Sequence, residues 1–174
     1  MVQDELNKFL DFAIQLGASD GKIIKASDII VGDWVRIKCQ YGCSGYGQCL
    51  TCPPYSPTPA MTRKILSNYQ WAILLKFVPK MSDYDWSLTH KVTVKLEKEL
   101  FLNGYYNAFG FASGPCPYCS ECNLEQCKHP GKARPSMEAS SIDVYATVRK
   151  AGFEINVIRR RDEQPKFFTV VLVC

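Results

Sequence analysis

Apolar residues recur at helical spacing in two long stretches of the chain. The first places five of them on one face and can end at Gly17: Leu6, Phe9, Leu10, Ala13 and Ile14. The second repeats every four residues until Asn103-Gly104: Leu88, Val92, Leu96 and Leu100. Both patterns predict amphipathic helices. Ser82 with Asp85 resembles a capping box ahead of the second one, and His90 lies off its apolar stripe, where we expect it to be exposed.

Capping residues indicate two shorter helices. Thr58 can be an N-cap with Pro59 in the first helical position, and the side chains that would face inward are Met61, Ile65 and Leu66. Further on, Ser140 or Ser141 can cap a helix that ends at Gly152 and carries Val144, Tyr145 and Val148.

Apolar runs without helical spacing predict the strands. Residues 69–78 read as a central strand, and residues 105–113 as a second buried strand that leads to Cys116. Residues 153–158 and 166–173 read as a hairpin. A short extended segment, with Trp34, Val35 and Ile37, precedes Cys39.

Together these elements predict an α+β fold with a single domain over residues 1–174. We expect a mixed or partly antiparallel sheet of about four to five strands, with three to four helices and two cysteine-rich metal loops. The length of 174 residues and the balance of 47% hydrophobic to 22% charged residues suit one folded domain and argue against disorder.

The composition narrows the location and the partners. No run approaches the roughly 20 apolar residues of a membrane helix, and the N-terminus lacks a signal-peptide pattern, so we expect a cytoplasmic protein that does not enter the membrane. The net charge of +4 suits an acidic protein partner or an anionic substrate. The sequence has no stripe of interleaved aromatic and basic residues of the kind that would indicate nucleic-acid binding.

The nine cysteines are the strongest chemical signal. Disulfides are rare where thiols are kept reduced, so dense cysteine in a cytoplasmic protein indicates a metal. Eight fall into two compact groups and Cys174 is left over, for which a buried thiol is the default interpretation.

The later group consists of Cys116, Cys119, Cys122 and Cys127, with the spacing C-x2-C-x2-C-x4-C. Thiols at consecutive x2 intervals can point at one centre from a tight loop, which suits the iron corners of a [4Fe-4S] cluster. Zinc is the alternative, although it usually takes cysteines as separated pairs.

The earlier group consists of Cys39, Cys43, Cys49 and Cys52, with the spacing C-x3-C-x5-C-x2-C. Its spacing is less diagnostic. It fits a second four-cysteine cluster, a cluster held by three cysteines with one open iron, a zinc knuckle, or ligands shared with the later group.

The motifs CQYGC, CPPYSPTP, GPCPYCSEC and RPSMEASSIDV occur in this order from about Val35 onward. In this combination the chain resembles a prokaryotic family of predicted metal-binding proteins (domain of unknown function 2284). The resemblance implies a soluble, cysteine-rich metal-binding protein of a kind common in anaerobes. It also implies that the earlier group is built on Cys39, Cys43 and Cys52, with Cys49 less regular, which favours an open iron site there.

Polar residues follow the later cysteine group. Arg134, Glu138 and Asp143 could form a polar pocket beside a cluster, but a structural role at the start of a helix is the favoured interpretation. His129 is expected on a surface loop. The basic residues 159–161 are expected at the hairpin tip, solvated or docking an acidic partner.

These patterns favour an iron–sulfur redox protein with one or two [4Fe-4S] clusters. It would pass electrons to a partner, such as an acidic ferredoxin or flavodoxin, or to a bound small molecule. One alternative is an enzyme whose 39–52 cluster has an open iron for substrate or sulfur chemistry. The other is a structural zinc module for protein interaction. No catalytic residue is indicated.

Overall fold

The computed structural model describes residues 2–79, 85, 87–160 and 162–174. Its helices are α1 (Val2–Gln15), α2 (Asp33–Gly42), α3 (Pro59–Leu66), α4 (Ser87–Leu102) and α5 (Val144–Lys150), with the short 3-10 helices η1 (Ala26–Asp28) and η3 (Glu138–Ser140). Its strands are β1 (Asp20–Lys25), β2 (Trp71–Phe77), β3 (Phe109–Phe111) and β4 (Phe167–Leu172). The predicted α+β class is confirmed.

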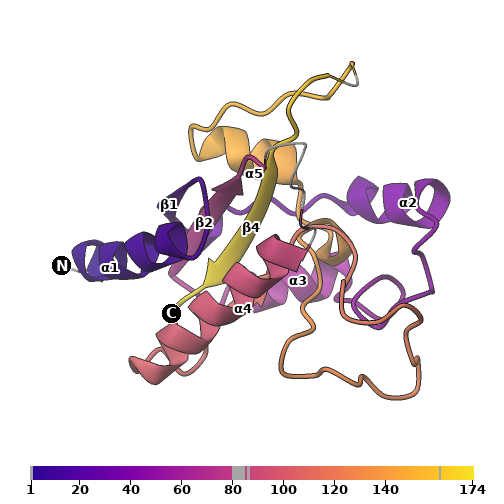
Figure 1. The fold of residues 1–174 in the computed structure, drawn as a ribbon, viewed down its shortest axis with the longest axis horizontal. Helices are drawn as coiled ribbons and strands as arrows, with labels where there is room; N and C mark the ends of the chain where they lie inside the picture. The colour runs from indigo at the N-terminus through magenta and orange to yellow at the C-terminus, as the bar shows by residue number, and fades with distance from the viewer. Residues whose placement is uncertain (1, 80–84, 86, 161) are drawn as a thin grey trace.

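The four strands form one antiparallel sheet in the order β1-β2-β4-β3 (Figure 1). Side chains alternate along β2 between the two faces of the sheet. Ile73 and Leu75 pack against α1 and α4, whereas Ala72 and Leu74 pack in a second core with α3 and α5. A strand that is buried on both faces reads as a continuous apolar run, which is why residues 69–78 were correctly predicted to form a central strand.

The predicted helices are present in the described chain, with local corrections. The Thr58 hydroxyl accepts a hydrogen bond from the Met61 amide at 3.3 Å, so the predicted N-cap of α3 is confirmed. Met61 itself is 52% exposed, and its neighbour Thr62 is buried in its place. In α5 the cap is Asp143, whose carboxylate accepts from the Ala146 amide at 2.9 Å. Ser140 and Ser141 lie in and just after η3 instead.

Helix α4 differs from expectation at both its start and its interior. Ser82 of the expected capping box lies outside the described residues, while Asp85 accepts from the amide and hydroxyl of Ser87 at 2.8 and 2.5 Å. His90 was predicted to be exposed and is fully buried. The segment after β3 covers this side of α4, because the carbonyl of Ser113 lies 3.2 Å from the His90 Nε2 atom.

The expected extended segment before Cys39 is wrong, because it forms α2. Val35 is buried while Trp34 and Ile37 are exposed, at 50% and 57%, so only one face of the helix is covered. Apolar and β-branched residues at adjacent positions are typical of a strand, which explains the prediction. In this segment, however, buried and exposed residues do not alternate as they would along a strand.

The expected hairpin is also wrong, although its second strand, predicted over 166–173, is present as β4. Residues 153–158 form no strand, although Phe153 and Ile155 are buried and alternate with exposed neighbours. Their carbonyl groups bond to side chains instead of to a neighbouring strand: Arg149 donates to the Ile155 carbonyl at 3.2 Å. One of the two edge strands of the sheet is β1, which the sequence analysis missed. No helix of the described chain is long and apolar enough to cross a membrane.

Candidate metal centre

The two cysteine loops lie beside each other, away from the sheet, at the right of Figure 1. Helix α2 carries Cys39 and leads into the loop before α3, and β3 leads into the loop that holds the later group. The loops touch directly, because the amide of Leu50 donates a hydrogen bond to the sulfur of Cys122 at 3.5 Å. Segments far apart in sequence therefore bring all eight grouped cysteines to one region.

Cys49 belongs to the earlier group by its sequence spacing, but in the structure it also lies beside the later group. One cavity is lined by Cys49, Cys116, Cys119, Cys122 and Cys127, together with Leu50, Thr51, Tyr118, Asn123, Lys128, His129 and Ala133. Its volume of about 20 Å³ is room for about one water molecule. The later four thiols therefore line one cavity, and a fifth thiol joins them.

Cys39, Cys43 and Cys52 form the second neighbourhood. Burial raises the pKa of Cys52 to about 12, and the nearby Cys49, Cys43 and Cys39 contribute to the rise. Burial also raises the pKa of Cys39, followed by the influence of Cys43 and Glu138. Cys52 is thus the residue that lies between the two sets of thiols.

Backbone amides donate hydrogen bonds to sulfurs in both loops. Gly45 donates to Cys43 at 3.4 Å and His129 to Cys127 at 3.3 Å, each from two residues further along the chain. Leu50 donates to Cys122 across the two loops. Amides aimed at sulfur favour the thiolate, which is the form that binds metals, and they tune the reduction potential of a bound cluster.

The thiols around the first cavity shift one another's protonation. Burial raises the pKa of Cys116 to about 11, and the nearby Cys49, Cys127 and Cys119 add to the rise. Burial acts in the same direction on Cys49, but hydrogen bonds with Thr51, Cys122 and Cys52 outweigh it and lower the pKa of Cys49. A bound cation removes the mutual repulsion of such thiolates, so the donor set fits a thiophilic metal.

As placed, no group of three or more His, Cys, Asp or Glu side chains among the described residues could hold one metal ion. The thiols lie in one region but do not converge on a single position, so metal binding requires the two loops to tighten around the metal. Cys43 is exposed and the other seven grouped cysteines are half-buried.

Polar contacts fix the ends of the loop that carries the earlier group. Arg36 on α2 donates to the carbonyls of Pro54 and Pro57 at 3.3 and 3.1 Å, which holds the turn after Cys52. The Ser56 hydroxyl donates to the Ala139 carbonyl at 2.6 Å, which attaches the same turn to η3. Arg36 was not singled out in the sequence analysis; its position three residues before Cys39 on one helix face is the signal that could have found it.

Arg134, Glu138 and Asp143 have separate partners. Arg134 pairs with Glu97 of α4 and Asp143 caps α5, in agreement with the favoured structural interpretation. Glu138 is different, because its Oε2 atom is buried and has no hydrogen-bond partner in the described structure. It lies next to Cys39, whose Sγ is 3.9 Å from the Glu138 carbonyl oxygen.

Aromatic rings line the wall of the first cavity. Tyr118 contacts the rings of both His90 and His129, with centroids 6.2 and 5.9 Å apart. His129 is half-buried rather than free on the surface. In the basic segment expected at a hairpin tip, Arg161 lies outside the described residues and Arg160 pairs with Asp162 at 2.6 Å.

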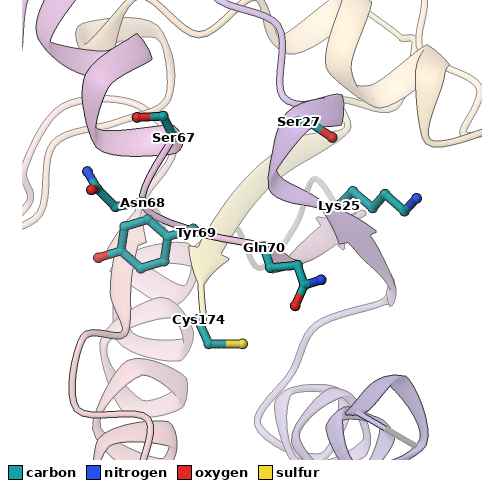
Figure 2. A pocket seen from close by; sticks show the side chains of 7 residues that line it. All are labelled: Lys25, Ser27, Ser67, Asn68, Tyr69, Gln70 and Cys174. Carbon is teal, nitrogen blue, oxygen red and sulfur yellow. The ribbon is translucent and has the colours of Figure 1, made fainter.

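Cys174 lies across the molecule from the cysteine loops (Figure 1). Figure 2 shows it in an open pocket of about 520 Å³, with Lys25, Ser27, Ser67, Asn68, Tyr69 and Gln70. The Tyr69 hydroxyl is already engaged, donating to the Asn107 carbonyl at 2.6 Å. This pocket therefore holds one thiol and no second metal-binding side chain.

A family model described as predicted metal-binding protein (DUF2284) matches residues 22–173. The chain belongs to this family. The match includes both cysteine groups and reaches further toward the N-terminus than the resemblance from Val35 onward. The DUF2284 description assigns metal binding without naming the metal. No curated protein and no solved structure matches the chain significantly.

Proposed function

We propose that this DUF2284 protein is an iron–sulfur redox protein that carries one or two [4Fe-4S] clusters. The observation that carries the proposal is the placement of the 116–127 thiols around one cavity, with Cys49 as a fifth. Their consecutive x2 spacing suits the corners of a cubane better than paired zinc knuckles. A bound cluster would supply one-electron transfer without bond-making chemistry by the protein.

The surrounding residues would hold and tune the bound group. The amides of Leu50 and His129 donate to cysteine sulfurs and so stabilise their negative charge. Tyr118, whose ring contacts two histidine rings, lines one wall of the cavity. Thr51 holds the Cys49 sulfur at 3.3 Å from its hydroxyl oxygen.

The rim of the cavity offers a docking surface for a redox partner. Lys128 lines the cavity and is exposed, as is Lys132 nearby in the loop. Together with the net charge of +4, this supports an acidic partner such as a ferredoxin or flavodoxin, because opposite charges speed encounter. Electron transfer to that partner is expected to slow as salt increases.

The test is anaerobic purification with iron, acid-labile sulfide and zinc counted per chain, followed by EPR of the reduced protein. We expect iron and sulfide in near-equal amounts and a reversible one-electron signal. Cys119→Ser should lower the iron content, whereas the matched variant Cys174→Ser should leave it unchanged. Colourless protein with zinc and no sulfide would overturn the proposal and favour a structural zinc site.

A second candidate function is supported by the position of Cys49. Because Cys49 lines the first cavity, the earlier group is left with three neighbouring thiols, a set that could leave one iron open to a substrate or to sulfur chemistry. In that case added sulfide or a small thiol should change the EPR signal of this centre only. A pure electron relay should show no such change.

A further inference from the structure

The carboxyl group of Glu138 lies beside the three-thiol neighbourhood. Helix η3, which begins at Glu138, packs against α2, and the Sγ of Cys39 donates to the Glu138 carbonyl at 3.9 Å. The charge of the carboxyl also acts on Cys39, so the acid and the thiol are close in space. Glu138 therefore lies beside Cys39, and it comes from a part of the chain outside both cysteine loops. Cys43 and Cys52 would join it only once the loops tighten.

One oxygen of this carboxyl group has no partner. Ser136 and the Glu138 amide interact with the carboxyl, but Oε2 is buried and makes no hydrogen bond within the described chain. The residue as a whole is only half-buried, so the burial is concentrated at the carboxyl end. Buried polar atoms in folded proteins are almost always paired, and an exception points to a ligand or a functional role.

Arg36 lies near this region but does not neutralise the acid. It acts on Cys39, but its guanidinium donates to carbonyl groups of the turn that follows Cys52. An acid buried without a counter-charge stays neutral, and a metal cation is one of the few groups that can compensate its carboxylate form.

We propose that Glu138 is the fourth ligand of a metal centre held by Cys39, Cys43 and Cys52. The inference rests on the metal-binding role proposed above and completes its second site. Cys49, the remaining thiol of this group, lines the other cavity and is not needed here. On binding, the three thiols and the carboxyl each release a proton to water, and the metal takes the vacated lone pairs.

A mixed set of this kind gives the centre one exchangeable position. Thiolates are soft ligands and carboxylate oxygen is hard, so a thiophilic metal holds the oxygen least tightly of the four. A small anion or thiol would therefore enter by replacing Glu138, which leaves the three sulfurs in place. A small thiol or sulfide bound in this way could also bring sulfur to the site.

The experiment compares Glu138→Gln and Glu138→Cys with wild type and with a matched control, Glu121→Gln, an exposed acid in the other loop. Each is made in the full chain, both alone and with Cys116→Ser and Cys119→Ser, so that the second site can be read without the first. Metal-free protein is titrated anaerobically with Co²⁺, whose thiolate charge-transfer and d–d bands report the number of sulfurs and the geometry. Circular dichroism checks the fold.

We expect Glu138→Gln to bind Co²⁺ at least about ten-fold more weakly with an altered d–d spectrum, since even loss of an outer partner costs 10- to 100-fold. Glu138→Cys should restore tight binding and add a fourth thiolate band, and Glu121→Gln should match wild type. Unchanged binding in Glu138→Gln would overturn the inference. If Glu138→Gln does not fold, Glu138→Cys decides, because four thiolate contributions support the assignment and three refute it.

Failure of this inference is separable from failure of the proposed function. A chain that contains iron and sulfide at the 116–127 site but binds no Co²⁺ at the second site would overturn only the role of Glu138. A chain that binds no iron, zinc or cobalt at either site would overturn both the role of Glu138 and the proposed function.

Discussion

Arg134 and Glu97 form a two-pronged ion pair where the later cysteine loop returns to the sheet. The Arg134 Nε atom lies 2.7 Å from one carboxylate oxygen and a terminal nitrogen 2.5 Å from the other, with both side chains only 13–14% exposed. The same carboxylate accepts from the Gly110 amide of β3 at 2.8 Å. Arg134 also donates to the Pro130 carbonyl at 3.2 Å and lies over the Phe109 ring. The pair therefore joins α4, β3 and the end of the loop.

We expect Glu97→Gln to lower the free energy of unfolding by about 2–4 kcal/mol, because Arg134 then keeps its charge in a partly buried place without a partner. Urea denaturation followed by circular dichroism measures the change. The control is Asp33→Asn, which breaks the exposed Asp33–Arg63 pair and should have a far smaller effect. Equal effects of the two variants would show that the Arg134–Glu97 pair does not anchor the loop.

Arg36 is expected to position the second site without binding a metal itself. Replacing it by Met removes the hydrogen bonds to the turn after Cys52 while keeping most of the apolar stem. We expect Arg36→Met to lower metal occupancy at the 39–52 group and leave the 116–127 site intact, as read from iron per chain and from the EPR spectrum. Lys38→Met, an exposed neighbour on α2, is the matched control. Loss of metal at both sites would indicate general unfolding instead.

The sequence predicted best where burial alone decides the pattern. The run at 69–78 and the repeat from Leu88 to Leu100 each have an apolar pattern that only one secondary structure buries, and both were correct. Residues 153–158 were wrongly predicted to form a strand because Phe153 and Ile155 are buried in alternation with exposed neighbours, although no strand pairs with them. Strand β1 was missed because a short, polar edge strand is specified mainly by the register of β2 beside it.

At the metal centre, the grouping of cysteines by their spacing along the chain differs from their grouping in the folded protein. Sequence analysis placed Cys49 with Cys39, Cys43 and Cys52, whereas it lines the cavity of the later group. Contacts between loops, such as that of Leu50 with Cys122, have no local sequence signal. The sequence analysis considered Glu138 for a pocket beside a cluster, but its place next to Cys39 could not be predicted, because the two are about a hundred residues apart along the chain.

The regrouping predicts different effects for two cysteines of the same loop. Cys49→Ser should act mainly on the EPR signal or metal affinity of the 116–127 site, because Cys49 lines the first cavity, although it also lies beside Cys52. Cys43→Ser should reduce metal at the second site alone. Iron and sulfide counts with EPR of each anaerobically prepared variant measure both effects. If both variants lose the same centre, the assignment of Cys49 to the first cavity is wrong.

His90 is expected to make stability depend on pH. It is fully buried, its Nε2 lies 3.2 Å from the Ser113 carbonyl oxygen, and its Nδ1 has no partner within the described residues. Burial lowers the pKa of His90 below the ordinary value of about 6.5. Between the folded and the ordinary pKa the unfolded chain binds the additional proton, so stability is complete above about pH 6.5 and falls as the pH drops toward the lowered value.

The slope due to this one group cannot exceed about 1.4 kcal/mol per pH unit, the value for one proton. We expect the melting temperature of metal-free protein to fall on acidification from pH 7.5 to 5, and to fall less steeply in His90→Gln. Comparing slopes rather than absolute melting temperatures separates titration from any packing loss in the variants. A wild-type slope in His90→Gln would mean that other groups cause the acid sensitivity.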